Sequence, residues 1–221
     1  MRWLIQDGDL QPFLRPISEL EKTSISLVVV RDYVDQLLGS EKTRVCKMSP
    51  KRSQEFSSGR YAAHQAQKAI GLKPMEILSE GRVPIWPKGQ VGAITHGAKY
   101  AGAIVSSELK GVGLDFELIG RIQSKLYEKL FTGFEKNWLS QQTRQEASTI
   151  MFSAKESVYK SIYPILNRYV GFQEVEINLD WASSAFAVRY RADDMSEISK
   201  CETRGFWSVS ENYVLTIVEV R

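Results

Sequence analysis

The sequence has few cysteines and lacks long apolar runs. Cys46 and Cys201 are the only cysteines among 221 residues. They form neither a disulfide framework nor a zinc-type spacing, which favours a reducing compartment. No apolar run approaches the ~20 residues that a membrane-spanning helix needs. The N-terminal stretch M-R-W-L-I-Q-D-G-D-L turns acidic too early for a signal peptide. We therefore expect a cytoplasmic protein without a membrane span.

A strong excess of charge is also missing. The net charge is +3, from 29 basic and 26 acidic residues, which is too small to indicate a nucleic-acid partner. Neither G-x-x-x-x-G-K-[ST] nor G-x-G-x-x-G occurs, which argues against the nucleotide-loop enzymes. The hydrophobic content of 43% is typical of a globular chain with one large domain or two small ones.

Positive charge is concentrated between Glu41 and Arg60. Six basic residues oppose two acidic ones there, namely Lys42, Arg44, Lys47, Lys51, Arg52 and Arg60 against Glu41 and Glu55. The segment is either a site for an anionic ligand or a solvated basic face. Ser49-Pro50 predicts a helix start, with the helix running to Ile70 before Gly71. Arg52 and Arg60 can lie on one side of that helix, and His64 within it is interpreted as structural.

The remaining hydrophobic patterns predict mainly strands. The expected strands and hairpins are Ile25–Val30, Met75–Trp86 with its turn at Glu80-Gly81, Val91–His96, Tyr100–Ser106, Gly111–Leu118, Phe172–Leu179, Ala185–Tyr190, and Phe206–Val209 with Tyr213–Val220. The expected helices are Tyr33–Leu38, closed by Gly39, and segments within Arg121–Gln142. No regular βαβ unit is visible, so the pattern favours an α+β fold with antiparallel sheet.

The segment Met151–Tyr163 (M-F-S-A-K-E-S-V-Y-K-S-I-Y) predicts a helix that begins near Glu146 and is ended or kinked by Pro164. Glu156 and Lys160 are four residues apart and share a helix face. By itself this spacing is typical of a solvated ion pair.

A second cluster lies upstream, in G-V-G-L-D-F-E-L from Gly111 to Leu118. On a strand, Asp115 and Glu117 project from the same face because the side-chain period is two. Two such carboxylates repel each other unless a cation lies between them. With Glu156 as a third carboxylate the set suits Mg²⁺, and Lys160 suits a phosphate.

These motifs resemble a known family. G-L-D-F-E followed by F-S-A-K-E-S-V-Y-K is similar to the two signature motifs of the 4'-phosphopantetheinyl transferases. V-P-I-W-P-K-G-Q-V-G-A-I-T-H, from Val83 to His96, resembles the preceding motif of the siderophore-synthase branch, which is enterobactin synthetase component D-like. The resemblance covers Val83–Lys160, and the flanking segments carry no motif.

The resemblance implies two similar halves with the active site between them, residues 1–110 and 111–221. It implies that 4'-phosphopantetheine moves from coenzyme A to a serine of an apo carrier protein, with Mg²⁺ as cofactor and 3',5'-ADP as product. The implied metal ligands are Asp115, Glu117 and Glu156. The implied catalytic residues are Glu156, Lys160 and His96, with either Glu156 or a metal-bound water as the base that accepts the serine proton.

The resemblance also implies which residues bind the phosphates of coenzyme A. They are Arg52, Arg60, Arg82 for the 3'-phosphate, Thr95, His96 for the pyrophosphate, Lys155 and Lys160. A-I-T-H departs from the family's more frequent S-x-S-H, but Thr95 keeps the hydroxyl. The stretch L-F-T-G-F-E-K-N-W-L is similar to a family region that helps to meet the carrier protein.

Two other classes of function stay open. The D-x-E pair also suits another Mg²⁺-dependent phosphoryl enzyme such as a nuclease, and the fold could serve a non-catalytic coenzyme A-binding protein. The motifs do not identify the carrier protein. Similar families of this length act as monomers, so we expect a monomer.

Overall fold

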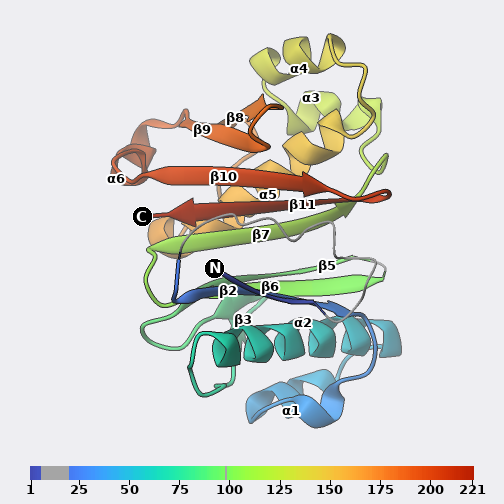
Figure 1. Ribbon diagram of the computed structural model, residues 1–221, viewed down its shortest axis with the longest axis vertical. Helices are drawn as coiled ribbons and strands as arrows, with labels where there is room; N and C mark the ends of the chain where they lie inside the picture. Colours follow the sequence, from blue (N-terminus) through green and yellow to red (C-terminus); the bar gives the residue numbers. More distant parts are fainter. Residues whose placement is uncertain (6–19, 98) are drawn as a thin grey trace. The chain divides into compact units, whose positions relative to one another are not determined.

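The computed structural model describes residues 1–5, 20–97 and 99–221. The chain divides into two compact units, Met1–Leu109 (unit 1) and Lys110–Arg221 (unit 2). Each contains a sheet and one helix of 20 residues, which is α2 (Pro50–Ala69) in unit 1 and α5 (Ala147–Leu166) in unit 2 (Figure 1). None of the described helices combines the length and apolarity needed to cross a membrane. The expectation about a signal peptide rests partly on residues 6–10, which lie outside the described residues.

Among the described residues of unit 1, the larger sheet has four strands. Their order is β1 (Arg2–Ile5), β2 (Thr23–Val29), β6 (Tyr100–Ser106) and β5 (Val91–His96). β1 pairs with β2 in parallel, and the other pairs are antiparallel. The three central predictions for this sheet are confirmed, because the alternating and β-branched runs at 25–30, 91–96 and 100–106 all form strands.

Helix α2 packs on this sheet through small residues. Ala62 and Ala63 are fully buried and pack in one cluster with Val28, Ala101 and Ala103 of the strands. Their short side chains let the helix lie close to the sheet. The predicted start is confirmed, since Ser49 is extended and Pro50 occupies the first turn.

Unit 1 also shows one wrong prediction. Tyr33–Leu38 forms only a single 3-10 turn, η2 (Val34–Gln36), and Gly39 begins a helix instead of ending one. That helix is α1 (Ser40–Val45), and Gly39 precedes it with φ +44°. The next prediction is confirmed: β3 (Leu78–Glu80) and β4 (Val83–Ile85) form a hairpin whose turn contains Gly81 at φ +56°.

The sheet of unit 2 has five antiparallel strands. Their order is β7 (Gly111–Leu118), β11 (Tyr213–Val220), β10 (Thr203–Val209), β9 (Ala185–Tyr190) and β8 (Val175–Asp180). The predicted strand at 111–118 and the closing hairpin are confirmed, whereas β8 begins three residues later than predicted. Mixed helices and mainly antiparallel sheets in both units confirm the α+β class.

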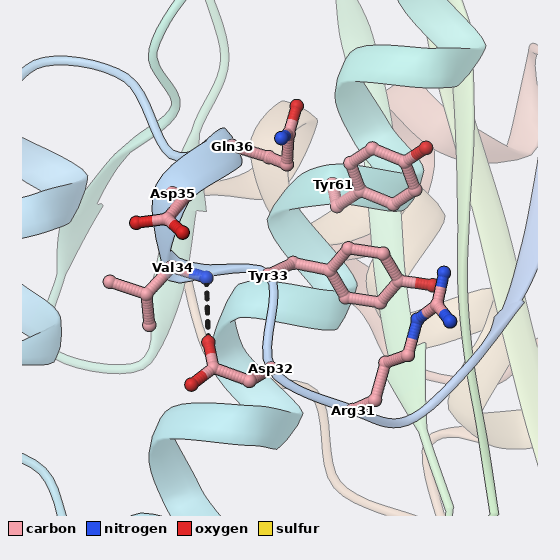
Figure 2. A pocket seen from close by; sticks show the side chains of 7 residues that line it. All are labelled: Arg31, Asp32, Tyr33, Val34, Asp35, Gln36 and Tyr61. Carbon is pink, nitrogen blue, oxygen red and sulfur yellow. Dashed lines mark hydrogen bonds between the residues drawn. The ribbon is translucent and has the colours of Figure 1, made fainter.

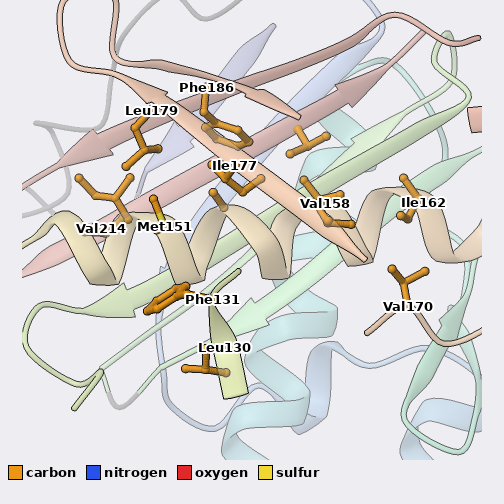
Figure 3. Packing of buried hydrophobic residues seen from close by; sticks show 14 of the residues in the cluster. Leu130, Phe131, Met151, Val158, Ile162, Val170, Ile177, Leu179, Phe186 and Val214 are labelled. Carbon is orange, nitrogen blue, oxygen red and sulfur yellow. The ribbon is translucent and has the colours of Figure 1, made fainter. Parts of the chain in front are cut away.

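Helix α5 covers one face of this sheet and supplies much of the core. Met151, Val158 and Ile162 are buried among Ile177 of β8, Phe186 of β9 and other apolar side chains (Figure 3). Pro164 lies inside the last turn of α5, and the helix ends at Asn167 in the left-handed conformation. The proline therefore does not end the helix, which continues to Leu166.

Short elements fill the segment before α5 and the segment before β10. The helical segments expected within Arg121–Gln142 are η3 (Ser124–Leu126), α3 (Tyr127–Leu130) and α4 (Gly133–Ser140). Thr132 and Glu135 form a capping box that starts α4. Between β9 and β10 lie η4 (Asp193–Met195) and α6 (Ser196–Ser199).

Candidate functional site

Two glycines of β7 allow the backbone of α5 to approach this strand closely. A Cβ atom at Gly113 would lie 1.8 Å from the Ser157 carbonyl oxygen, and one at Gly111 would lie 2.2 Å from that of Ser161. Only glycine fits at such distances. The contact brings the polar face of α5 against the strand that carries Asp115 and Glu117.

Asp115 is held by α5 on both of its carboxylate oxygens. Ser153 donates to Oδ2 at 2.8 Å, and the Lys160 ammonium donates to Oδ1 at 2.7 Å. Lys160 also donates to the Leu114 carbonyl oxygen at 3.0 Å. The sequence places Asp115 and Lys160 45 residues apart, and the structure joins them in one ion pair that is mostly buried.

Glu117 and Glu156 lie within the electric field of Asp115. Burial, and then the charge of Asp115, raises the pKa of the Glu117 carboxyl, although Arg121 donates to Glu117 at 2.8 Å and opposes the rise. Burial also raises the pKa of Glu156, with Lys160 opposing and both Asp115 and Glu117 adding to the rise. Three carboxyl groups from β7 and α5 therefore influence one another.

The carboxylates suit a hard divalent cation in their chemistry, but they are not assembled as a ligand set. In residues 1–5, 20–97 and 99–221, no group of three or more His, Cys, Asp or Glu side chains is arranged to hold a metal ion. Asp115 forms an ion pair with Lys160, and Glu117 forms an ion pair with Arg121. Burial is the main cause of the raised pKa of Glu117 and of Glu156, and repulsion from the neighbouring carboxylates adds to it. A bound cation would remove that repulsion, so the donor chemistry fits such an ion.

The structure places Lys155 away from these carboxylates. Its side chain is fully buried, and its ammonium lies 2.8 Å from a Glu135 carboxylate oxygen. It also donates to the carbonyl oxygens of Phe172 at 2.6 Å and Val175 at 2.8 Å. With all three ammonium donors engaged inside the core, Lys155 cannot reach a phosphate in solution. The phosphate-binding role that the resemblance implied for Lys155 does not fit this environment.

Unit 1 contains a basic pocket of about 580 Å³, which we call the arginine pocket. Its lining includes basic and polar side chains from α1, α2, the β3–β4 hairpin and β5, namely Arg44, Arg52, Arg60, Ser79, Arg82 and His96. Among the described residues that line it, Glu55 is the one acidic residue. Three predicted phosphate-binding arginines and the predicted histidine therefore line one cavity.

His96 and Arg52 contact each other at the edge of this pocket. Arg52 Nη1 lies 2.8 Å from His96 Nε2 and 3.2 Å from a Glu55 carboxylate oxygen. Because arginine can only donate, Nε2 accepts and the imidazole proton of His96 is on Nδ1. Ile94 and His96 line the pocket, whereas Thr95 lies between them on the strand, is buried, and is not part of the lining.

Arg60 is the most buried basic residue of the arginine pocket. Its Nη2 donates to Ser79 Oγ at 2.6 Å, and its guanidinium lies 4.8 Å from the centre of the Phe56 ring. Burial lowers the pKa of Arg60 to about 10, with Glu41 opposing the decrease. Arg60 stays cationic at neutral pH, and its charge faces the cavity from the side of α2.

A second hollow of about 550 Å³ lies at another part of unit 1. Figure 2 shows Arg31, Tyr33 and Tyr61 on one side of it and Asp32 and Asp35 on the other. The rings of Tyr33 and Tyr61 stack with centres 4.2 Å apart, and the Arg31 guanidinium lies 4.9 Å from the Tyr33 ring centre. None of the predicted site residues lines this hollow.

Sequence reasoning missed several residues of these sites. Arg44 was noticed only as part of a charge excess, although it lines the arginine pocket. Ser153 was not singled out, although it fixes Asp115. A signal for Ser153 was present, because Ser153, Ser157 and Ser161 recur every four residues and so form a polar stripe on α5 that faces β7 and β11.

Comparison with protein-family models matches both units of the chain. Residues 40–106 match the 4'-phosphopantetheinyl transferase N-terminal domain. Residues 111–218 match the 4'-phosphopantetheinyl transferase superfamily.

Curated relatives extend over most of the chain. 4'-phosphopantetheinyl transferase Svp of Streptomyces mobaraensis is 30% identical over 199 residues, which cover 86% of this chain and 80% of that protein. 4'-phosphopantetheinyl transferase PptT of Mycobacterium tuberculosis is 29% identical over 193 residues, which cover 82% of this chain and 85% of that protein. Enterobactin synthase component D of Escherichia coli is 29% identical over 173 residues, which cover 76% of this chain and 78% of that protein.

Similar solved structures cover about half of the chain. The holo-[acyl-carrier-protein] synthase of Thermotoga maritima has a TM-score of 0.42 at 21% identity, and covers 51% of this chain and 64% of that one. A holo-(acyl-carrier-protein) synthase from Bacillus anthracis in complex with CoA (3',5'-ADP) has a TM-score of 0.41 at 19% identity, and covers 51% and 96%.

Proposed function

The chain belongs to the 4'-phosphopantetheinyl transferase superfamily, and we propose that it transfers the 4'-phosphopantetheine group of coenzyme A to a serine of an apo carrier protein. The reaction we propose is Mg²⁺-dependent and releases 3',5'-ADP. We further propose that it operates in the cytosol, that the enzyme is a monomer, and that residues 1–110 and 111–221 are its two domains.

The main support for this proposal is the set of three carboxylate side chains on β7 and α5. Asp115 and Glu117 share one face of a strand, and Glu156 adds its charge from the helix packed against that strand. The shifted pKa values, together with Lys160 on Asp115, are typical of a site that handles phosphoryl groups and protons. A surface ion pair between Glu156 and Lys160 alone would show none of these features.

The arginine pocket supports coenzyme A as the donor. Its adenosine end carries several phosphate charges, and arginine binds phosphate through paired, charge-assisted hydrogen bonds. We assign Arg52, Arg60 and Arg82 to these phosphates, as the resemblance implies, and add Arg44 because it lines the same cavity. His96, with Nε2 oriented toward Arg52, is assigned to the pyrophosphate.

The group transfer requires one bond to form and one to break. The serine oxygen bonds to the phosphorus that carries pantetheine, and the bond from that phosphorus to the bridging oxygen breaks, so that 3',5'-ADP leaves. We propose that Glu156 accepts the serine proton, which is the role that the resemblance implies for it. Lys160 donates to the transferring phosphate once its ammonium turns from Asp115.

Asp115, Glu117 and Glu156 are the residues that would hold a divalent cation. When bound, the cation neutralises charge on the pyrophosphate and on the departing phosphate. Ser153 fixes Asp115 in orientation through its hydrogen bond, so one ligand is already held by α5. Arg121 must leave Glu117 for that carboxylate to serve as a ligand.

We also propose that the acceptor is a carrier domain of siderophore or non-ribosomal peptide synthesis. The enterobactin synthase component D relatives and the V-P-I-W-P-K-G-Q motif support this assignment. The alternative, a non-catalytic coenzyme A-binding protein of the same fold, does not explain why Lys160 and Ser153 both hold Asp115.

Intact-protein mass spectrometry tests this function directly. The protein is mixed with coenzyme A, Mg²⁺ and an apo peptidyl carrier domain, and a parallel sample contains EDTA. We expect the carrier to gain one phosphopantetheine group and the gain to disappear with EDTA. A carrier variant with alanine in place of its acceptor serine is the matched control.

No gain with peptidyl, fatty-acid and polyketide carriers, alongside clear binding of coenzyme A, would identify a binding protein instead. A gain that persists after complete removal of divalent ions would refute the cation dependence. A gain on fatty-acid carriers alone would refute the siderophore assignment while leaving the transfer reaction intact.

A further inference from the structure

Glu41 is a buried carboxylate that none of the proposed chemistry uses. Its side chain, on α1, is almost fully enclosed. Oε2 accepts a hydrogen bond from the Leu38 amide at 2.9 Å. Oε1 accepts from the Ile77 amide at 2.8 Å and from His64 Nε2 at 3.2 Å, and lies 3.8 Å from Arg60 Nε. A carboxylate with this many donors is firmly fixed in position.

The four groups around the Glu41 carboxylate come from three segments of unit 1. Leu38 precedes α1, His64 and Arg60 are on α2, and Ile77 directly precedes β3. One carboxylate thus ties together α1, α2 and the segment before β3, and the last of these is 36 residues away from Glu41 in the sequence.

The same three segments carry the arginines of the arginine pocket. Arg44 is on α1, Arg52 and Arg60 are on α2, and Arg82 is in the β3–β4 turn. Arg44 adds a link between two of them, because it donates to the carbonyl oxygens of Ser79 and Gly81. The relative positions of the four arginines therefore depend on the segments that Glu41 joins.

Glu41 also compensates the buried charge of Arg60. Arg60 Nε has no hydrogen-bond partner among the described residues, and Glu41 is the carboxylate nearest to it. Without that negative charge, burying the guanidinium would be costly, and Arg60 would turn toward solvent through the pocket. Glu41 keeps Arg60 in the position from which Nη2 reaches Ser79.

We infer that Glu41 is the positioning residue of the arginine pocket, which sets the spacing of its arginines for a ligand with two or more phosphate groups. Glu41 does not touch the ligand and acts through Arg60 and through the three segments that it ties. This inference rests on the proposed function for the identity of the ligand, but not for the existence of an anion site.

Glu76 provides a matched control for Glu41. Its Oε2 accepts from the Ser40 amide at 2.8 Å and from Ser40 Oγ at 2.9 Å, so it also joins α1 to the segment before β3. These bonds lie at the surface, and Glu76 contacts none of the arginines in the described residues. Glu76→Gln removes a charge from the same junction without disturbing Arg60.

Isothermal calorimetry with inorganic pyrophosphate and with coenzyme A tests the inference. Glu41→Gln keeps the shape of the side chain but removes its charge and one acceptor. We expect this variant to bind each ligand about tenfold or more weakly than the unchanged protein does. The affinities of Glu76→Gln should stay within about twofold of those of the unchanged protein. In the transfer assay we expect the KM for coenzyme A to rise and kcat to change little, a division that general loss of stability does not produce.

Unchanged affinity for both ligands in Glu41→Gln overturns the inference, and so does an equal loss in Glu76→Gln. If Glu41→Gln does not fold, Glu41→Asp is measured, since it keeps the charge and shortens its reach. A folded Glu41→Asp protein with normal pyrophosphate affinity also overturns the inference. If the unchanged protein binds pyrophosphate but not coenzyme A, the proposed function fails and the Glu41 comparison still stands on pyrophosphate.

Discussion

Buried glutamates of the two units have pKa values shifted in opposite directions. In unit 1, burial alone would raise the pKa of Glu41, but hydrogen bonds from His64 and from the amides of Leu38 and Ile77 outweigh it, and the pKa is lowered. In unit 2, burial raises the pKa of Glu117, and the neighbouring charge of Asp115 adds to the rise.

The difference separates a structural carboxylate from one available to a ligand. Glu41 has its donors built into the fold, so its negative charge is already compensated. Glu117 and Glu156 face other carboxylates, so their charges are compensated only in part. Perturbation by burial together with like charges is typical of functional sites, whereas compensation by fixed donors is typical of structural ones.

The same contrast occurs between two lysines of α5. Lys155 is 0% exposed and is enclosed by Glu135 and two carbonyl oxygens at the edge strand β8. The side chain of Lys160 is 26% exposed and forms an ion pair with Asp115. Five residues along one helix separate a lysine of the core from a lysine that solvent can reach.

The largest expected effect is on the uncompensated group of carboxylates. Asp115→Ala should lower the transfer rate by about a thousandfold or more, because it removes a proposed cation ligand and the partner of Lys160. Circular dichroism should show an intact fold, and the mass-spectrometric assay gives the rate. Asp193→Ala, at an exposed position of unit 2, is the control. Near-normal turnover in Asp115→Ala would remove Asp115 from the site.

The next effect concerns the compensated side of the comparison. Lys155→Met should destabilise the chain by about 3–5 kcal/mol, because it leaves Glu135 as an unpaired buried charge. Adding Glu135→Gln should restore much of the loss, since glutamine still accepts from the Ile177 amide. Urea denaturation measures both variants. A small loss of stability combined with weak binding of coenzyme A would mean that Lys155 does reach the phosphates.

A smaller effect is expected for the second lysine. Lys160→Ala should weaken the binding of coenzyme A by roughly 1.5–3 kcal/mol, which is the value of a charge-assisted phosphate contact, and should cause little loss of stability. Calorimetry measures the affinity, and Lys125→Ala at an exposed position of unit 2 serves as the control. Equal affinities in the two variants would leave Lys160 as a partner of Asp115 only.

The strands and the carboxylate face could be predicted because their signals are local. Alternation with a period of two placed Asp115 and Glu117 on one side of β7, and spacing by four placed Glu156 and Lys160 together on α5. The T-x-x-E pattern at Thr132 and Glu135 was also local, and a capping box could have been recognised there.

The environment of Lys155 could not be predicted in the same way. One residue along a helix turns the side chain by about 100°, so Lys155 points to another neighbour than Glu156 does. That neighbour, Glu135, is set by how α4 packs on β8, which no local pattern reveals. The role of Glu41 likewise depends on segments separated by up to 36 residues. The sequence also predicted that Gly39 ends a helix, whereas in the structure Gly39 comes directly before helix α1.

The smallest expected effect is a gain of stability at Glu117. A carboxyl group whose pKa is raised by folding binds its proton more tightly in the folded chain. Its contribution to stability is therefore present below the ordinary pKa of about 4.3 and is lost as the pH rises through the raised value. At pH 7 the raised pKa of Glu117 therefore counts against folding, and Glu117→Gln should raise the melting temperature by a few degrees in EDTA.

This gain should depend on pH and on the cation. As the pH falls toward the ordinary carboxyl range, Glu117 becomes protonated in the unchanged protein, and the two melting curves should converge. With Mg²⁺ the order should reverse, because the unchanged protein is stabilised by the ion and the variant has lost a ligand. Glu41→Gln should behave in the opposite way, losing stability at pH 7 and less at low pH, since a lowered pKa contributes above the ordinary value. If both substitutions shifted the melting temperature in the same direction at pH 7, the contrast between compensated and uncompensated glutamates would be wrong.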